Sequence, residues 1–285
     1  MATVELLADD LQFGESPRWH DGALWFSDME DRAVKTIDDA GKIATVVEVP
    51  NGPGGLGWLP DGTLLVVSMF DLTLRRFDGR ELSVHADLSG IGSFAANDMA
   101  VSAAGRAYVG DFGFDVFGAF QQRSVPDVLA DHRTASIAIV DADGRVRTGA
   151  TDMHFPNGAV ITPDGAMLIV AESLSASVTA FDIAADGSLH NRRLWAQPGQ
   201  RMPDGICLDV DGHIWVANPG GNECVLIAEG GDVLDVVLTE KPCFACALGG
   251  PDGRTLFMMT ANQTEPGADR DARVVTTRVA SPAAG

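Results

Sequence analysis

No apolar run in the sequence approaches the about 20 residues that a helix needs to cross a bilayer. The first residues also lack the basic start and the long apolar segment of a secretory signal. We therefore expect a cytoplasmic protein that does not enter a membrane. Positive charge is scarce as well, because 20 Lys and Arg against 40 Asp and Glu give a net charge of −20. That charge repels phosphate backbones and anionic lipids, so neither nucleic acid nor a membrane is an expected partner.

Cysteine is sparse too, since four residues in a chain of 285 do not suggest the disulfide framework of a small secreted domain. Cys243 and Cys246 have the spacing of a metal or redox pair, but no second such pair and no His pair completes a zinc site. We expect buried, inert thiols. The sequence also contains no GxSxG and no HExxH motif, which argues against the commonest serine hydrolases and zinc proteases.

A short pattern does recur: Asp-Gly or Ala-Gly, then four to seven residues rich in Leu, Val, Ile and Trp, then a polar break. Its copies begin at residues 21, 61, 104, 164, 211 and 252, and strand-like segments follow each copy. A strand-rich repeat of this length is typical of a four-stranded propeller blade. The pattern predicts an all-β fold, a six-bladed β-propeller that forms one domain over residues 1–285. We expect the ring to close by pairing residues 4–9 with 273–279.

The longest interval between copies contains an insertion at residues 111–135. Four aromatic side chains lie within it, namely Phe112, Phe114, Phe117 and Phe120. Clustered aromatics in a glycine-punctuated loop indicate either a lid over an apolar ligand or a loop packed against the body. Both interpretations stay open.

Polar residues stand six or seven positions before four of the six turns: Glu15, Asn97, Asn157 and Asp204. In a propeller these positions are structurally equivalent and lie at one mouth of the central channel. Glu15, Asn157 and Asp204 supply two carboxylates and an amide oxygen without sulfur or histidine. Such a set suits a hard divalent cation such as Ca²⁺, Mg²⁺ or Mn²⁺.

Four segments, GESPRW (14–19), FPNGAVITPDGAMLIVAES (155–173), SLSASVTAFDIAADGSLHNRR (173–193) and MPDGICLDVDGHIWVAN (202–218), resemble the SMP-30/gluconolactonase family. The likeness extends over nearly the whole chain in order and spacing. It implies a six-bladed propeller with one divalent metal in the channel and metal-dependent lactone hydrolysis. By motif match it makes Glu15, Asn157 and Asp204 the metal ligands, and it places Asn97 at the substrate or near the metal.

The chain departs from that pattern at Ala95, where sugar-lactone members tend to carry an arginine that binds substrate hydroxyls. Their acidic lid residue matches only Asp115, inside the aromatic insertion. A site without the guanidinium and with added phenylalanines suits a lactone or ester less polar than a sugar lactone. Candidate substrate contacts are therefore Asn97, Asp115, Phe112, Phe114 and His132.

The expected mechanism uses one divalent cation, Ca²⁺, Mg²⁺, Mn²⁺ or Zn²⁺, to polarise the lactone carbonyl. A water bound to that cation or oriented by Asp204 attacks, and Asp204 acts as both ligand and general base. Asn97 donates a hydrogen bond to the substrate carbonyl. A first alternative is hydrolysis of an organophosphate triester at the same site. A second, of another class, is a non-catalytic calcium-binding or interaction propeller. The sequence does not specify the metal, the native substrate or the oligomeric state.

Overall fold

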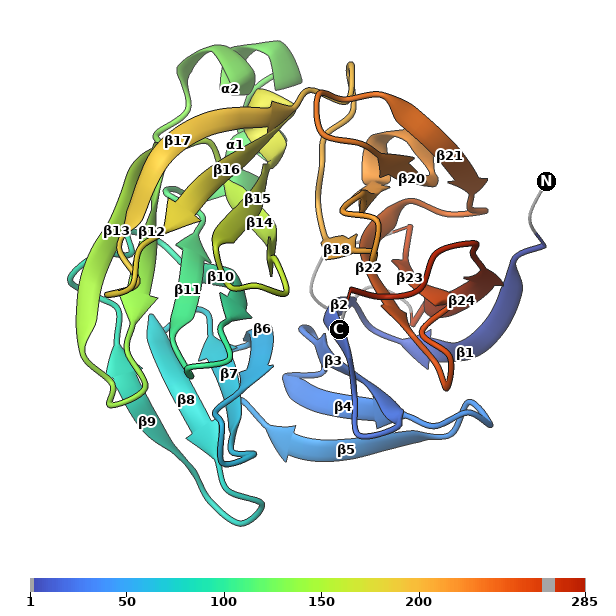
Figure 1. The fold of residues 1–285 in the computed structure, drawn as a ribbon, viewed down its shortest axis with the longest axis horizontal. Coiled ribbons are helices and arrows are strands. Elements are labelled where there is room, and N and C mark those ends of the chain that lie inside the picture. The colour runs from blue at the N-terminus through green and yellow to red at the C-terminus, as the bar shows by residue number, and fades with distance from the viewer. Residues whose placement is uncertain (1–2, 263–269, 285) are drawn as a thin grey trace.

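The six recurring turns each join the first two strands of an antiparallel sheet in the computed structural model, which describes residues 3–262 and 270–284. Their six glycines adopt φ values between 69° and 84°, a region that side chains other than glycine rarely enter. Six four-stranded sheets result, and they surround a central channel (Figure 1). The predicted six-bladed β-propeller is confirmed.

The blades are numbered here in chain order from the first recurring turn. Blade 1 contains β2 (Gly14–His20), β3 (Ala23–Asp28), β4 (Ala33–Ile37) and β5 (Ile43–Glu48). Blade 2 contains β6 (Pro53–Trp58), β7 (Leu64–Ser68), β8 (Thr73–Phe77) and β9 (Leu82–Asp87). Blade 3 contains β10 (Ala96–Val101), β11 (Ala107–Asp111), β12 (Ala135–Val140) and β13 (Val146–Met153).

The second half of the ring repeats this order. Blade 4 contains β14 (Pro156–Ile161), β15 (Met167–Glu172), β16 (Ser177–Ile183) and β17 (Leu189–Ala196), with a 3-10 turn at Ser173–Ser175. Blade 5 contains β18 (Ile206–Leu208), β19 (Ile214–Asn218), β20 (Glu223–Ile227) and β21 (Val233–Leu238), with a 3-10 turn at Pro219–Gly221. Blade 6 contains β22 (Cys243–Gly249), β23 (Thr255–Thr260), β24 (Ala272–Arg278) and β1 (Glu5–Leu11).

The first strand of each blade lies next to the channel, and these strands pack against one another around it (Figure 1). Glycine permits their close approach, since a Cβ added to Gly158 would lie 2.5 Å from the Ile206 nitrogen. At Gly55 the added Cβ would lie 2.4 Å from the Met99 nitrogen. The inner strands therefore pack closely around the channel at these glycines, and the neighbouring residues lie near the channel axis.

The ring closes in blade 6, where β1 pairs antiparallel with β24. Glu5 lies opposite Thr276 and Leu11 lies opposite Ala272, so the predicted pairing of the two chain ends is confirmed. Leu11 is fully buried. The first residues of the chain thus complete the last sheet.

Deletion of residues 1–8 should therefore destabilise the whole ring. It removes most of the β1 ladder and exposes the edge of β24, a loss of about 2–4 kcal/mol that lowers the melting temperature by roughly 5–10 °C. Asp9→Ala, at an exposed position of β1, is the control and should leave the melting temperature unchanged. A truncated protein that melts with the full chain would contradict the closure of the ring through β1.

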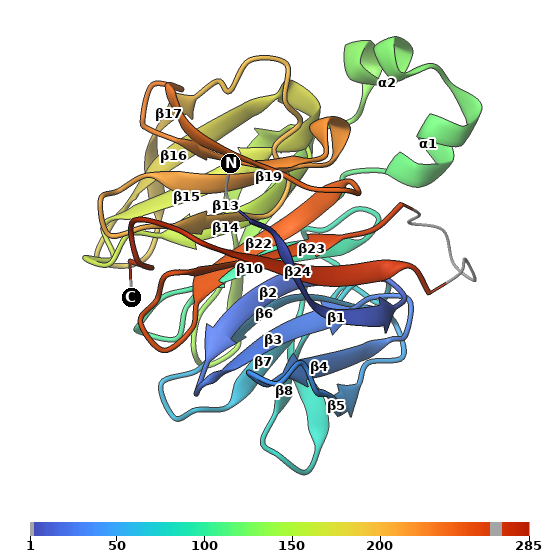
Figure 2. The ribbon, with the colours of Figure 1, turned by 90° about the vertical axis from the view of Figure 1, so that its right-hand side faces the viewer.

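The insertion at residues 111–135 contains two short helices, α1 (Val116–Gln122) and α2 (Val125–Asp131), where the sequence predicted only a loop. The Asp115 carboxylate caps α1 by accepting from the Gly118 nitrogen at 2.9 Å, and Ser124 caps α2. Seven residues are too few for apolar spacing to identify a helix. Both helices stand out from one face of the ring (Figure 2). None of the helices in the described ranges has the length and apolar character that membrane crossing requires.

Candidate metal centre

A cavity of about 120 Å³ lies where the inner strands meet the insertion. Four polar residues from four different blades line it, together with eight apolar residues, six of which are phenylalanine. The lining residues are Phe13, Glu15, Met29, Asn97, Phe112, Val116, Phe117, Phe120, Phe155, Asn157, Asp204 and Phe244. The structure thus brings together the four polar residues that the sequence placed at equivalent positions.

Hydrogen bonds hold the two asparagines in defined orientations. The Asn157 amide nitrogen donates to Ser173 Oγ at 3.2 Å, and Ser173 Oγ donates to the Pro203 carbonyl at 2.8 Å. The Asn97 amide nitrogen donates to the Pro156 carbonyl at 3.1 Å. Because the Asn157 nitrogen is engaged by Ser173, its carbonyl oxygen is the atom left to act as a ligand.

The pKa values of the two carboxyl groups, Glu15 and Asp204, are raised in the folded protein. Burial, and secondarily the Asp98 charge, raises the pKa of Glu15 to about 8, although the Ser16 amide donates to Glu15 Oε2 at 3.0 Å. Burial, followed by the charges of Glu15 and Asp98, also raises the pKa of Asp204 well above its usual range. Both residues are half-buried at the cavity. Two carboxylates in one poorly solvated space repel each other unless they bind protons or a cation.

Asp204 shows the need for a partner most directly, because its Oδ1 is buried and has no hydrogen-bond donor among the residues that the structure describes. Buried polar oxygens are nearly always satisfied, so this atom indicates a missing ligand. An oxygen-only set composed of Glu15, Asn157 and Asp204 fits a hard divalent cation. Cation binding would replace the protons that the raised pKa values indicate.

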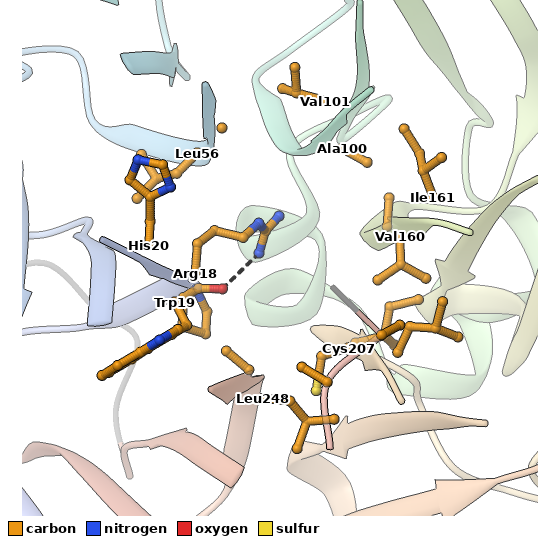
Figure 3. Close-up of a pocket in the computed structure, with 18 of the residues that line it drawn as sticks. Arg18, Trp19, His20, Leu56, Ala100, Val101, Val160, Ile161, Cys207 and Leu248 are labelled. Atoms are coloured by element: carbon orange, nitrogen blue, oxygen red, sulfur yellow. Dashed lines mark hydrogen bonds between the residues drawn. The ribbon is translucent and has the colours of Figure 1, made fainter. Parts of the chain in front are cut away.

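An ion pair below the cavity was not foreseen from the sequence. The Arg18 guanidinium donates to Asp98 Oδ1 and to the Met99 carbonyl, both at 2.8 Å. Asp98 is almost fully buried, and its charge acts on both Glu15 and Asp204. Arg18 and Asp98 are 80 residues apart, so no local pattern could have paired them. Arg18 also lines a second, larger cavity of about 480 Å³ that does not include Glu15, Asn157 or Asp204 (Figure 3).

Helix α1 forms the aromatic wall of the candidate site. Val116, Phe117 and Phe120 lie on one face of this helix and all line the cavity. The Phe112 ring packs edge-on against Phe155, with ring centres 4.8 Å apart. Phe155 and Phe13 each stand two positions before a polar site residue, just ahead of strands β14 and β2, and this shared offset is the signal that could have revealed them.

Two of the five predicted substrate contacts, Asn97 and Phe112, line the cavity. The other three, Phe114, Asp115 and His132, do not. Asp115 caps α1, and the Phe114 and His132 rings lie 6.2 Å apart. His132 Nε2 lies 2.8 Å from His154 Nδ1, which ties the end of α2 to blade 4. A role for Phe114, Asp115 and His132 in substrate binding stays a prediction. Ala95 is fully buried, and the cavity lining contains no Arg or Lys.

Asp209, Asp211 and His213 form another group of possible metal ligands within the described residues. Asp209 Oδ1 accepts from the backbone nitrogens of Asp211 at 3.0 Å and of His213 at 2.8 Å. These bonds close the turn between β18 and β19. None of the three residues lines the cavity around Asp204.

Comparison with known proteins gives one family and a consistent fold. The family model described as SMP-30/Gluconolactonase/LRE-like region matches residues 13–262. Regucalcin from Bos taurus is 26% identical over 264 residues, which cover 90% of this chain and 85% of the relative. Regucalcin from Danio rerio is 24% identical over 257 residues, which cover 88% of this chain and 83% of the relative.

Solved structures share the fold at lower identity. A luciferin-regenerating enzyme aligns with a TM-score of 0.82 and 18% identity, covering 99% of this chain and 97% of its own. A gluconolactonase from Xanthomonas campestris aligns with a TM-score of 0.76 and 20% identity, covering 99% of this chain and 90% of its own.

Proposed function

The chain belongs to the SMP-30/gluconolactonase/LRE-like family, and from that premise we propose that it is a metal-dependent hydrolase of a lactone or ester less polar than a sugar lactone. One observation carries the proposal: the buried, unpartnered Asp204 Oδ1 lies among oxygen ligands at a cavity walled by phenylalanine. The names gluconolactonase and regucalcin among similar proteins agree with a lactonase or a calcium-binding propeller.

Glu15, Asn157 and Asp204 would hold the cation. An oxygen-only set favours Ca²⁺, Mg²⁺ or Mn²⁺ over Zn²⁺, which more often takes nitrogen or sulfur ligands. When bound, the cation would act as a Lewis acid on the substrate carbonyl. Asn157 is positioned for this role by Ser173, which also bonds to the carbonyl of Pro203 and so links blade 4 to the loop that carries Asp204.

Asp204 is the general base of the proposed reaction. Its carboxylate orients a water toward the carbonyl carbon and accepts the proton that the water loses. Asn97 donates its second amide hydrogen to the carbonyl oxygen, since the first is held by the Pro156 carbonyl. When the ring C–O bond breaks, Asp204 returns the proton to the leaving oxygen. The products are a hydroxyl group and a carboxylic acid, which releases its proton to solvent and becomes a carboxylate.

The cavity walls favour an apolar substrate. Eight of the twelve lining residues are apolar, and no guanidinium is present to bind sugar hydroxyls. The volume of about 120 Å³ is smaller than that of typical ligand sites, which hold several hundred Å³. Displacement of α1, which supplies three of the apolar residues, would be required for larger substrates.

A substrate panel tests this function. The purified protein is assayed with Ca²⁺, Mg²⁺ or Mn²⁺ on gluconolactone, alkyl γ- and δ-lactones, an aryl ester and a phosphotriester. We expect alkyl lactones to exceed gluconolactone by about tenfold or more in kcat/KM, from the apolar area that they bury. A preference for the phosphotriester would support the first alternative. Metal binding without turnover of any substrate would support a non-catalytic propeller.

Phe120→Ala tests the aromatic wall. Loss of a phenyl ring from the cavity should raise KM for an alkyl lactone by about tenfold and leave the KM for gluconolactone nearly unchanged. Phe70→Ala is the matched control, because this exposed phenylalanine does not line the cavity. Equal effects of Phe120→Ala on both lactones would contradict an apolar substrate subsite at α1.

Asn97→Ala should keep cation binding and lower kcat by about 10²-fold, since it removes one hydrogen-bond donor from the carbonyl oxygen. Calorimetric titration with the cation and steady-state kinetics measure the two effects. Asn97→Asp preserves the shape but replaces the donor by an acceptor, and it should lose rate as well. Loss of cation binding in Asn97→Ala would show instead that Asn97 is a ligand.

A further inference from the structure

All four cysteines gather at the seam between blades 5 and 6. Cys207 lies on β18, Cys224 on β20, and Cys243 and Cys246 on β22; all are buried and free. They share one core cluster. The sequence led us to expect inert thiols, but two of the four cysteines line a cavity and the other two do not.

Cys207 and Cys246 form the group that lines a cavity. Their sulfur atoms lie 3.7 Å apart, with the Cys207 thiol donating to the Cys246 sulfur. Both residues line the cavity of about 480 Å³, whereas Cys224 and Cys243 do not. Figure 3 shows Cys207 in this cavity. This cavity contains none of the candidate metal ligands. A small reactant in this cavity lies beside Cys207, which is 9% exposed, and reaches Cys246, which is 1% exposed, only when the side chains around the pair move.

The environment distinguishes the two sulfurs. Burial raises the pKa of Cys246, but hydrogen bonds from Cys207 and Cys224 outweigh it and lower that pKa to about 5. Burial and the Cys246 thiol raise the pKa of Cys207 well above its usual range. The Cys207 thiol donates to the Cys246 sulfur, an arrangement that favours the thiolate on Cys246. Because the thiolate is the nucleophilic form, we assign Cys246 as the attacking sulfur and Cys207 as the resolving one.

We propose that Cys207 and Cys246 are a redox-active dithiol, which a small peroxide entering the 480 Å³ cavity converts into a disulfide between blades 5 and 6. Neighbouring inner strands carry the two residues, so closing the gap requires side-chain rotation and a small approach of β18 and β22. The proposal is independent of the hydrolase function.

The reaction balances with hydrogen peroxide as oxidant. The Cys246 thiolate attacks one peroxide oxygen, the O–O bond breaks, and the leaving hydroxide is protonated to water. Cys246 is then a sulfenic acid. Cys207 loses its proton and attacks the Cys246 sulfur, the S–O bond breaks, and a second water leaves. Two thiols are oxidised to one disulfide while one peroxide is reduced to two waters.

Thiol counting on the full-length protein gives the first test. The protein is treated with hydrogen peroxide, denatured, and titrated with a chromogenic disulfide reagent. Two of the four thiols should be lost per chain, and dithiothreitol should restore them. Retention of all four thiols, under conditions that oxidise free glutathione completely, would overturn the proposal.

Peptide mapping identifies the linked pair. Cleavage before aspartate places Cys207 in peptide 204–208, Cys224 in 211–231, and both remaining cysteines in 235–251. After alkylation, mass spectrometry should find 204–208 joined to 235–251, with the sum of the peptide masses less two hydrogens. A link between 211–231 and 235–251, or one within 235–251, would exclude the proposed pair.

Single variants provide matched controls. Cys207→Ser and Cys246→Ser should each abolish the disulfide, whereas Cys224→Ser and Cys243→Ser should retain it. If Cys243→Ser lost the disulfide and Cys246→Ser kept it, Cys243 rather than Cys246 would form the bond. That result would overturn the proposed pairing. Fragment-ion sequencing of the linked wild-type peptides distinguishes Cys243 from Cys246 within 235–251, so it decides the outcome even if one variant fails to fold.

Discussion

Asp204→Ala should abolish divalent-cation binding and lactone hydrolysis together, with kcat/KM falling by about 10³-fold or more. The carboxylate supplies one ligand oxygen and is the proposed general base. Within residues 3–262 and 270–284 its Oδ1 has no hydrogen-bond partner, so we expect no neighbouring group to compensate for its removal. Ion binding is measured by calorimetric titration and hydrolysis with the most reactive lactone of the panel.

Two companion variants separate the roles of this residue. Asp204→Asn keeps the shape but cannot accept the proton, so it should lose turnover more completely than ion binding. Asp9→Asn changes an exposed carboxylate on β1, outside the cavity, and should behave as wild type. Full activity of the EDTA-treated wild-type protein would remove the metal from the mechanism.

The stability of the EDTA-treated protein should fall as the pH rises from about 5 to 8. The pKa of Glu15 is raised in the folded protein from 4.5 to about 8, so the folded state binds more protons than the unfolded state between these values. Its stabilising contribution is fully present below pH 4.5 and is lost as the pH rises through the folded pKa of about 8. The raised pKa of Asp204 acts in the same direction.

The size of this effect is moderated by solvent in the cavity. A pKa change of one corresponds to about 1.4 kcal/mol. Because the Glu15 side chain is partly exposed, we reduce its contribution to the free energy of unfolding to roughly 2 kcal/mol. Thermal melts at pH 5, 6, 7 and 8 in EDTA measure it. Glu15→Gln, which cannot ionise, should reduce the slope.

A saturating divalent cation should reverse the trend. Its ligands must lose their protons to bind, so the stabilisation by the cation grows with pH. At pH 8 the melting temperature with Ca²⁺ or Mn²⁺ should exceed that in EDTA by several degrees. If the EDTA-treated protein instead became more stable from pH 5 to 8, the shared burial of Glu15 and Asp204 would be wrong.

Local sequence was sufficient for the blades. Asp-Gly and Ala-Gly turns at a blade-length interval, each followed by an apolar run, specify strand pairs because glycine alone enters the required φ region readily. The same spacing placed Glu15, Asn97, Asn157 and Asp204 at equivalent positions, since every blade starts with its inner strand. The oxygen-only character of Glu15, Asn157 and Asp204 indicated a hard cation, and the family resemblance added the reaction class.

Tertiary structure alone decided what surrounds these residues. The Arg18–Asp98 ion pair and the Cys207–Cys246 pair depend on contacts between segments that are far apart in the chain. In a propeller, inner strands far apart in the chain meet at one axis, so neighbours at the site are not neighbours in sequence. Asp204 was one acidic turn residue among many until folding buried its Oδ1 without a donor, beside a second carboxylate.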